Sequence, residues 1–329
     1  MSAIWLPSAM ASLAALTMNT AAIEPVKTQI ADAPIAPNLT DAATEVLDLD
    51  TEANQRLTIP VTIDGAGPYD FMIDTGSQAT AVTHRINEAL QLESNGTATL
   101  VGMASSRQVD LVELDNLEVG TRVINNLSAP VLYRKHVGAD GIIGLDSLQD
   151  MRVLIDFRDE TIAVADATEG SSSRGFEIIV RARHKLGQLL ITNAKIEGVK
   201  TTVIIDTGAQ GSLGNLALQK RIRARRAQQV TATDVNGVTL QGEMSIARRM
   251  EIQGLTLTNM PITFADAPAF EALGLKDKPV ISLGMQHLKV FDRVAIDFAK
   301  QRILFDLPSK YRMRRANREA SRQAGPSRR

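Results

Sequence analysis

Two short stretches of this 329-residue chain bring an aspartate to the end of an apolar run. Residues 69–77 are YDFMIDTGS and residues 202–209 are TVIIDTGA, so Asp74 and Asp206 lie 132 positions apart. An ionised carboxylate that is buried alone is costly, and it must find partners or take up a proton. A single Asp-Thr-Gly is a weak signal, because turns use these residue types freely. Two copies in matched contexts predict two aspartates that meet and perform acid–base chemistry.

The composition argues against several other kinds of chemistry. The chain has no cysteine, which removes disulfides, thiolate metal sites and cysteine nucleophiles. The four histidines are not within metal-ligand spacing of one another, so each is interpreted as a surface or packing residue. A formal net charge of −1 and only 4% aromatic residues argue against nucleic-acid recognition. We therefore expect no metal and no other cofactor.

The two Asp-Thr-Gly copies belong to a longer internal repeat. Upstream, TIDGAGPYDFMIDTG aligns with KIEGVKTTVIIDTG. Each segment predicts a strand, a turn at Asp64-Gly65 or Glu197-Gly198, and a second strand that leads to the aspartate. Downstream, HRINEALQL in the first copy and NLALQKRI in the second have the character of short helices.

The repeat continues toward the end of each copy. GIIGLDSL at residues 141–148 matches ISLGMQHL at residues 281–288. VLIDFRDETIAV at residues 153–164 then matches VAIDFAKQRILF at residues 294–305. The Ile-Asp-Phe aspartates of this second match are interpreted as structural, hydrogen-bonding a turn in each copy.

The repeat predicts two homologous lobes, at residues 54–166 and 176–307, joined by a linker at residues 167–175. Each lobe is rich in short Val, Ile, Leu and Thr strands with glycine turns, and each has one or two short helices. This pattern favours an all-β, bilobal fold. Pseudo-symmetry between the lobes can bring the two aspartates together on one axis.

The two ends of the chain are predicted to lie outside the repeat. Residues 1–22 are interpreted as a signal peptide, with an uncleaved anchor or a disordered cytoplasmic start as alternatives. Residues 23–53 have the composition of a flexible linker. Residues 308–329 form a basic tail, interpreted as disordered, with contact to an anionic membrane surface as the alternative. The expected location is periplasmic or secreted, or membrane-anchored if the first segment is retained.

The chain resembles the retropepsin-like aspartic proteases, in a single-chain form that joins both halves. The resemblance covers both lobes and rests on Asp74-Thr75-Gly76, Asp206-Thr207-Gly208 and Ile142-Ile143-Gly144. It implies that Asp74 and Asp206 are catalytic and that Thr75 and Thr207 cross-link the two loops. Two such carboxylates share one proton, and the ionised partner activates a water molecule. The implied activity is endopeptidase action on an extended polypeptide, by a monomer and without a cofactor.

Two features break the internal symmetry around these motifs. The second aliphatic-Gly signature carries Ser282 where an aliphatic residue is usual, which is expected to weaken packing beneath the second loop but to leave the catalytic pair unaffected. The residue after each Asp-Thr-Gly is Ser77 in one copy and Ala209 in the other. The Ser77 hydroxyl is expected to donate to the outer oxygen of Asp74 and to favour its ionised form. Asp206 would then hold the shared proton more often.

By resemblance, two hairpins are candidates for substrate-binding flaps, at residues 98–112 and 231–245. The residues expected at the two tips are Gly102, Met103 and Ala104 in the first and Val235, Asn236 and Gly237 in the second. Asn-Gly is a strong hairpin-turn signal. An ordinary surface hairpin in each lobe is the alternative interpretation.

Three other functions stay open at this point. The same fold could grip a peptide without cutting it. An actin-like phosphotransferase also uses two Asp-x-Gly-Ser/Thr turns, to hold phosphate and magnesium, although these lobes lack the longer helices and Gly-rich adenosine loops that it needs. A glycosidase is a more distant alternative, because two carboxylates alone are a weak signal.

Overall fold

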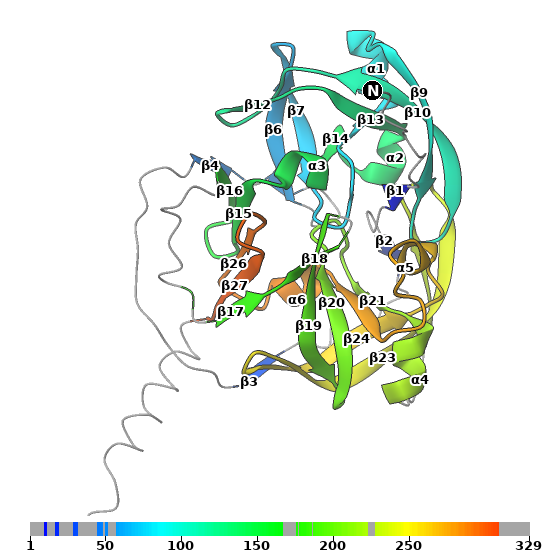
Figure 1. Cartoon of the computed structure of the whole chain (residues 1–329), viewed down its shortest axis with the longest axis vertical. Helices are drawn as coiled ribbons and strands as arrows, with labels where there is room; N and C mark the ends of the chain where they lie inside the picture. Colours follow the sequence, from blue (N-terminus) through cyan, green and yellow to red (C-terminus); the bar gives the residue numbers. More distant parts are fainter. Residues whose placement is uncertain are drawn as a thin grey trace, which may run out of the picture.

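The computed structural model shows two sheet-bearing lobes along the long axis of the molecule, with a third sheet beside them (Figure 1). It describes residues 10–11, 17–19, 29–31, 45–48, 50–51, 57–166, 176, 178–185, 187–222 and 228–308. The predicted inter-lobe linker and nearly all of the predicted basic tail fall outside these residues, as does most of the predicted signal peptide and flexible linker. Within the described residues, no helix has the length and hydropathy to cross a membrane.

The first sheet, with its helices, forms the N-terminal lobe. In spatial order its strands are β1 (Met10–Ala11), β9 (Ser94–Val101), β10 (Ser106–Leu114), β13 (Leu127–Leu132), β8 (Ala81–Thr83), β14 (Gly141–Ile143), β7 (Ala66–Ile73), β6 (Leu57–Ile63), β11 (Leu117–Val119) and β12 (Arg122–Ile124), and β5 (Asp50–Thr51) pairs with β6. The helices are α1 (His84–Leu90), α2 (Arg134–Val137) and α3 (Leu145–Leu148). Ile59, Val61 and Ile63 are buried on alternate positions of β6, as expected for a strand with one face on the core.

The second sheet and its helices form the C-terminal lobe, which repeats this plan. Its strands are β18 (Arg183–Lys185), β19 (Gln188–Ile196), β20 (Val199–Ile205), β25 (Val280–Leu283), β21 (Ser212–Gly214), β24 (Leu255–Phe264), β23 (Thr239–Ile252), β22 (Gln228–Thr233) and β2 (Thr17–Asn19), and β3 (Gln29–Ala31) pairs with β24. The helices are α4 (Leu216–Ile222), α5 (Pro268–Ala272) and α6 (Met285–Leu288). In both lobes the strand that leads to Asp-Thr-Gly lies parallel to the strand of the glycine signature, β7 with β14 and β20 with β25.

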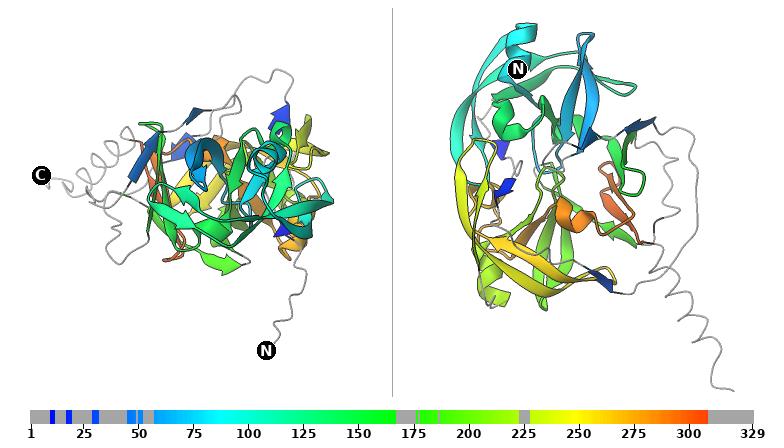
Figure 2. Two further views of the ribbon diagram at one scale, coloured as in Figure 1. Left: turned by 90° about the horizontal axis from the view of Figure 1, so that it is seen from above. Right: turned by 180° about the vertical axis from the view of Figure 1, so that it is seen from behind.

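The third sheet is shared by the two halves of the chain. Its order is β17 (Ile178–Arg181), β27 (Arg302–Asp306), β26 (Arg293–Asp297), β15 (Met151–Asp156), β16 (Thr161–Asp166) and β4 (Glu45–Asp48). Strand β15 pairs antiparallel with β26, so Leu154 lies opposite Ala295. Both views in Figure 2 keep this sheet to one side of the two lobes. The pairing ties the second half of each repeat into one rigid unit.

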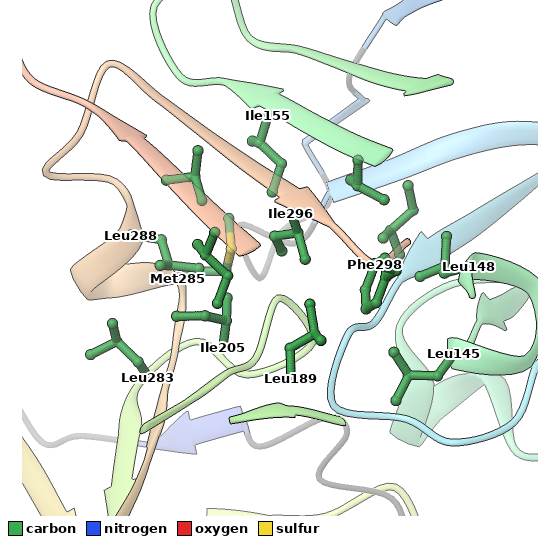
Figure 3. Close-up of a cluster of buried hydrophobic side chains, with 14 of the residues drawn as sticks. Leu145, Leu148, Ile155, Leu189, Ile205, Leu283, Met285, Leu288, Ile296 and Phe298 are labelled. Atoms are coloured by element: carbon green, nitrogen blue, oxygen red, sulfur yellow. The ribbon is translucent and has the colours of Figure 1, made fainter. Parts of the chain in front are cut away.

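An apolar core joins this shared sheet to the bases of both lobes. The labelled side chains of Figure 3 that meet there are Leu145, Leu148, Ile155, Leu189, Ile205, Leu283, Met285, Leu288, Ile296 and Phe298. Ile205 directly precedes Asp206, and Leu283 lies on the neighbouring strand. Burial of each such side chain contributes about 1.5–3 kcal/mol. The core therefore holds the loop that carries the second aspartate against both halves of the chain.

The predicted turns and helices are confirmed. Asp64 and Gly65 have φ of 49° and 73°, and Glu197 and Gly198 have φ of 48° and 80°. Two consecutive residues with positive φ give the turn that matches the twist of a two-stranded hairpin. Helices α1 and α4 lie in the two segments expected to be helical. Each lobe also has two helices of four or five residues, so the expectation of one or two helices per lobe was too low.

The two Ile-Asp-Phe aspartates are structural, as predicted. Asp156 accepts a hydrogen bond from the backbone N–H of Arg158 at 3.0 Å, and Asp297 accepts one from Lys300 at 2.9 Å. Each carboxylate is also paired with an arginine, Asp156 with Arg158 and Asp297 with Arg302. The pairs hold the hairpin turns of the shared sheet.

Candidate active site

Two buried strands deliver the aspartates to matching places. Asp74 follows the end of β7, and its N–H donates to the carbonyl oxygen of Ile143 on β14 at 3.0 Å. Asp206 follows β20, and its N–H donates to Leu283 on β25 at 3.1 Å. Each Asp-Thr-Gly loop is thus held by the glycine-signature strand of its own lobe.

The glycine of each signature is required by close backbone approach. A Cβ at Gly144 would overlap the backbone of Ala79 and Thr80. A Cβ at Gly284 would overlap the carbonyl oxygens of Gly211 and Ala209. The loop after each aspartate therefore folds directly over a glycine, which no other residue type permits without backbone movement.

The two loops are interlocked by their threonines. The Thr75 hydroxyl donates to the carbonyl oxygen of Ile205 at 2.8 Å, and the Thr207 hydroxyl donates to Ile73 at 2.7 Å. In return, the Thr75 N–H donates to the Thr207 hydroxyl at 3.0 Å, and the Thr207 N–H donates to the Thr75 hydroxyl at 3.2 Å. Both threonines are buried. Four crossed hydrogen bonds therefore bind one lobe to the other directly beneath the aspartates.

Asp74 lies against the loop that carries the other aspartate. A Cβ added at Gly208 would overlap the carboxyl carbon and both oxygens of Asp74. Asp74 and Asp206 each have 0% exposed surface. The fold thus brings together two acidic side chains that lie 132 residues apart in the sequence.

Backbone amides orient both carboxylates. Oδ1 of Asp74 accepts hydrogen bonds from the N–H groups of Gly76 at 2.7 Å and Ser77 at 3.0 Å. Oδ1 of Asp206 accepts from the N–H of Ala209 at 3.0 Å. Since backbone amides have little freedom in these loops, each carboxylate is held in one orientation.

Burial and mutual repulsion change the acidity of the pair. Burial, and secondly the negative charge of Asp74, raise the pKa of Asp206 well above its ordinary value. Hydrogen bonds from Ser282, Ala209 and Gly208 act in the opposite direction. Two neighbouring buried carboxyl groups with acidities shifted in this way can hold one proton between them. The pair can therefore supply an acid and a base at once.

The expected roles of Ser77 and Ser282 were wrong. The Ser77 hydroxyl donates to the carbonyl oxygen of Ala79 at 2.9 Å, because it points back into its own loop. The hydroxyl that contacts the pair belongs to Ser282, which donates to Oδ2 of Asp206 at 2.6 Å. The signature position that was expected to affect only packing therefore touches a carboxylate of the site.

The two predicted hairpins exist, and their tips contact each other. Strands β9 and β10 form the first, with its tip at residues 102–105, and β22 and β23 form the second, with its tip at residues 234–238. Asp234 of the second tip accepts from the Ala104 N–H at 3.0 Å and from the Ser105 hydroxyl at 2.9 Å. Asn236 donates to the same hydroxyl at 3.0 Å. Sequence reasoning missed Asp234, although an Asp two residues before Asn-Gly is a turn signal.

Each tip inserts one apolar side chain into the opposite lobe. Met103 is 1% exposed and packs among residues of the C-terminal lobe that include Leu190, Ile204, Ala209, Leu213 and Phe270. Val235 is 2% exposed and packs among residues of the N-terminal lobe that include Met72, Ala81, Leu132, Val137 and Ile142. Each hairpin tip is therefore anchored in the opposite lobe.

Glycine is required at both tips. A Cβ at Gly102 would come within 2.5 Å of Oδ2 of Asp234. A Cβ at Gly237 would overlap the ring of His136, and Gly237 also has a φ of 77°. A side chain at either position would separate the two tips or strain the backbone.

One further cross-lobe contact was missed by sequence reasoning. The side-chain amide of Gln188 on β19 donates to the carbonyl oxygen of Gly76 at 2.8 Å, and Gln188 is 1% exposed. It braces the first loop from the second lobe. No local pattern distinguishes this glutamine from a surface residue.

Two surface cavities are lined by residues other than the two aspartates. A cavity of about 110 Å³ next to the hairpin contact is lined in part by His84, Arg107, Tyr133 and Val235. A larger one of about 710 Å³ lies beside α4 and α5, and neither aspartate lines it. Among the residues that the structure describes, no three acidic or histidine side chains gather as a metal site requires.

Comparison with known families matches the same two regions. The family described as aspartyl protease matches residues 59–147 and residues 192–287, which together make up more than half of the chain. The first region contains Asp74 and the second contains Asp206. A comparison with curated proteins finds no matching sequence.

Proposed function

The chain belongs to the aspartyl protease family, in a two-lobed, retropepsin-like form, and we propose that it is an endopeptidase whose acid–base pair is Asp74 and Asp206. The observation that carries this proposal is the threonine interlock, which ties together the loops of two buried carboxyl groups and sets Asp74 against the loop that carries Asp206. An arrangement that places two desolvated acids together costs stability and is typical of a catalytic site.

The reaction follows from the single shared proton. The ionised carboxylate removes a proton from a water molecule, whose oxygen forms a bond to the carbonyl carbon of the peptide. The protonated carboxyl gives its proton to the carbonyl oxygen, which neutralises the developing charge. The tetrahedral intermediate then breaks its C–N bond. The leaving nitrogen takes the proton that the pair now holds, and one hydroxyl of the intermediate gives its proton to the other carboxylate as its carbonyl bond forms. The products are a carboxylic acid and an amine, and the pair returns to its starting charge.

The substrate in this proposal is a polypeptide in extended conformation. The hairpins would lie along it and form backbone hydrogen bonds, as strands do at a sheet edge. Because Met103 and Val235 are buried in opposite lobes, the tips must separate before a peptide can enter. Both aspartates come from one chain, so we propose that a monomer is active. A periplasmic or secreted location, and contact of the basic tail with a membrane surface, remain proposals from the sequence.

A peptide-binding module without catalysis is the second candidate, and the closed hairpins are the observation that favours it. A chain that kept its hairpins shut would bind ligands slowly and cut none. The phosphotransferase alternative has no such support, because the longest helices among the described residues, α1 and α4, have seven residues.

A digestion experiment separates these functions. Denatured casein or a peptide library is incubated with the protein, and the products are mapped by mass spectrometry with and without pepstatin. We expect cleavage that Asp74→Asn and Asp206→Asn each abolish. Asp159→Asn, the same change at an exposed carboxylate, is the matched control and should cut normally. Binding of peptides by wild-type protein and Asp74→Asn without any cleavage would favour the silent module instead.

A further inference from the structure

Ser282 occupies a place that is apolar in the other lobe. It lies on β25 opposite Ile204 of β20, and in the N-terminal lobe the matching position on β14 is Ile142, opposite Met72 of β7. Ser282 is 1% exposed. A serine in the interior of a buried strand has no packing advantage over an aliphatic residue, because its hydroxyl must find a partner.

The partner that it finds is the carboxylate itself. The Ser282 hydroxyl donates to Oδ2 of Asp206 at 2.6 Å, within the range of a well-formed O–H···O hydrogen bond. Oδ1 of the same carboxylate is held by the N–H of Ala209. Both oxygens of Asp206 are therefore fixed. The isoleucine at the matching place beside Asp74 has no hydroxyl to donate.

We propose that Ser282 is a positioning residue that makes the acid pair unequal: it holds Oδ2 of Asp206 in place and eases release of the shared proton from this carboxyl group. This inference rests on the proposed function, since it concerns the same pair. It locates the asymmetry of the site in the strand beneath the second loop and not in the residue that follows Asp-Thr-Gly.

The direction of the effect follows from the groups around Asp206. Burial and the charge of Asp74, from the opposite loop, raise its pKa. The donors on its own loop and the Ser282 hydroxyl on β25 favour the ionised form and lower it. His287, on the helix that follows β25, is bound to Ser212 and has a pKa lowered to about 4 by burial, so it is neutral at higher pH. Removal of the Ser282 hydroxyl should therefore raise the pKa of Asp206 further.

The test compares Ser282→Thr with Ser282→Val, which have the same shape but differ in the hydroxyl. Ser282→Ala is a second hydroxyl-free variant if valine perturbs the strand. Carboxyl ¹³C NMR of Asp-labelled protein measures the titration directly, with Asp206→Asn to assign the signal. We expect the upper apparent pKa of the pair to rise by about one to two units in the valine and alanine variants, and to stay near the wild-type value in threonine. Ser77→Ala should leave the upper apparent pKa of the pair unchanged.

The pH–rate profile provides the second measurement. Its upper limb should move to higher pH when the hydroxyl is lost, because this limb reports loss of the shared proton. In Ser282→Thr the limb should lie at the wild-type pH. An upper pKa that is the same in the threonine and valine variants, or a shift confined to the acid limb, overturns the inference. If the wild-type protein cleaves no peptide, the proposed function fails, and the NMR titration still decides the role of Ser282.

Discussion

A buried histidine beneath the second loop should make the protein sensitive to acid. His287 on α6 has 0% exposed surface, and its Nδ1 lies 2.6 Å from the hydroxyl of Ser212. That hydroxyl also accepts a hydrogen bond from the N–H of Gly284, in the glycine signature. The opposite ring nitrogen, Nε2, has no hydrogen-bond partner among the residues that the structure describes. Protonation of this ring would place an uncompensated charge inside the core.

The magnitude follows from the pKa of His287. Burial lowers it from 6.5 to about 4. Between these two values the unfolded chain binds a proton that the folded chain does not, so stability falls as the pH decreases through this window. Each pKa unit corresponds to about 1.36 kcal/mol, so the loss between pH 7 and pH 4 is about 3 kcal/mol from this one residue. Below about pH 4 the folded ring also takes up the proton, and no further loss follows.

The assay is urea unfolding at a series of pH values for wild type and His287→Asn, whose side-chain amide can still meet Ser212. Asp206 contributes in the opposite sense, since its raised pKa favours the folded state as the pH falls, but it is present in both proteins and cancels in the difference. We expect the variant to be less stable than wild type at pH 7, with a gap that narrows by about 3 kcal/mol at pH 4. The reasoning would be refuted if the difference in unfolding free energy between the two proteins were the same at pH 7 and pH 4. An NMR titration of His287 centred near pH 6.5 would refute it as well.

Three further predictions concern the loops and hairpins. Thr75→Val leaves the buried carbonyl of Ile205 without its hydroxyl donor and should cost about 1–3 kcal/mol in urea unfolding, while Thr75→Ser should recover most of it. Gly208→Ala introduces a Cβ where the Asp74 carboxyl lies, so peptide cleavage should fall at least about 100-fold while the unfolding transition stays cooperative; near-normal cleavage would contradict the site geometry. Asp234→Asn weakens the acceptor of two hydrogen bonds from the other hairpin, so hydrogen exchange at residues 102–105 should speed up, and unchanged exchange would show that the contacts of Asp234 do not hold the tips together.

Local sequence chemistry was sufficient for much of the architecture. The turns at Asp64-Gly65 and Glu197-Gly198 were predictable because a two-residue hairpin turn needs positive φ at both positions, and glycine accepts this conformation readily. All four residues have positive φ in the structure. Helices α1 and α4 were predicted from two helix-like stretches, and the all-β, bilobal class followed from short apolar strands, glycine turns and the internal repeat. The short helices after each glycine signature were missed, because four residues carry too little periodicity to be recognised.

Side-chain direction could not be predicted, and it decided the details of the site. Ser77 follows Asp-Thr-Gly and was the natural candidate to contact Asp74, yet its rotamer points toward Ala79. Ser282 lies 76 residues after Asp206, and only the parallel pairing of β20 with β25 brings its hydroxyl to the carboxylate. Asp234 likewise found its partners about 130 residues away, on the other hairpin.

The sequence by itself determined that two Asp-Thr-Gly loops exist in equivalent settings, because a repeat and its turn residues are local properties of the chain. Only the tertiary structure decided which groups each carboxylate meets. Backbone amides of its own loop bind each carboxylate, but the Ser282 hydroxyl comes from another strand, and the Gly208 backbone that meets Asp74 comes from the other lobe. Packing of the shared core brings these distant groups together.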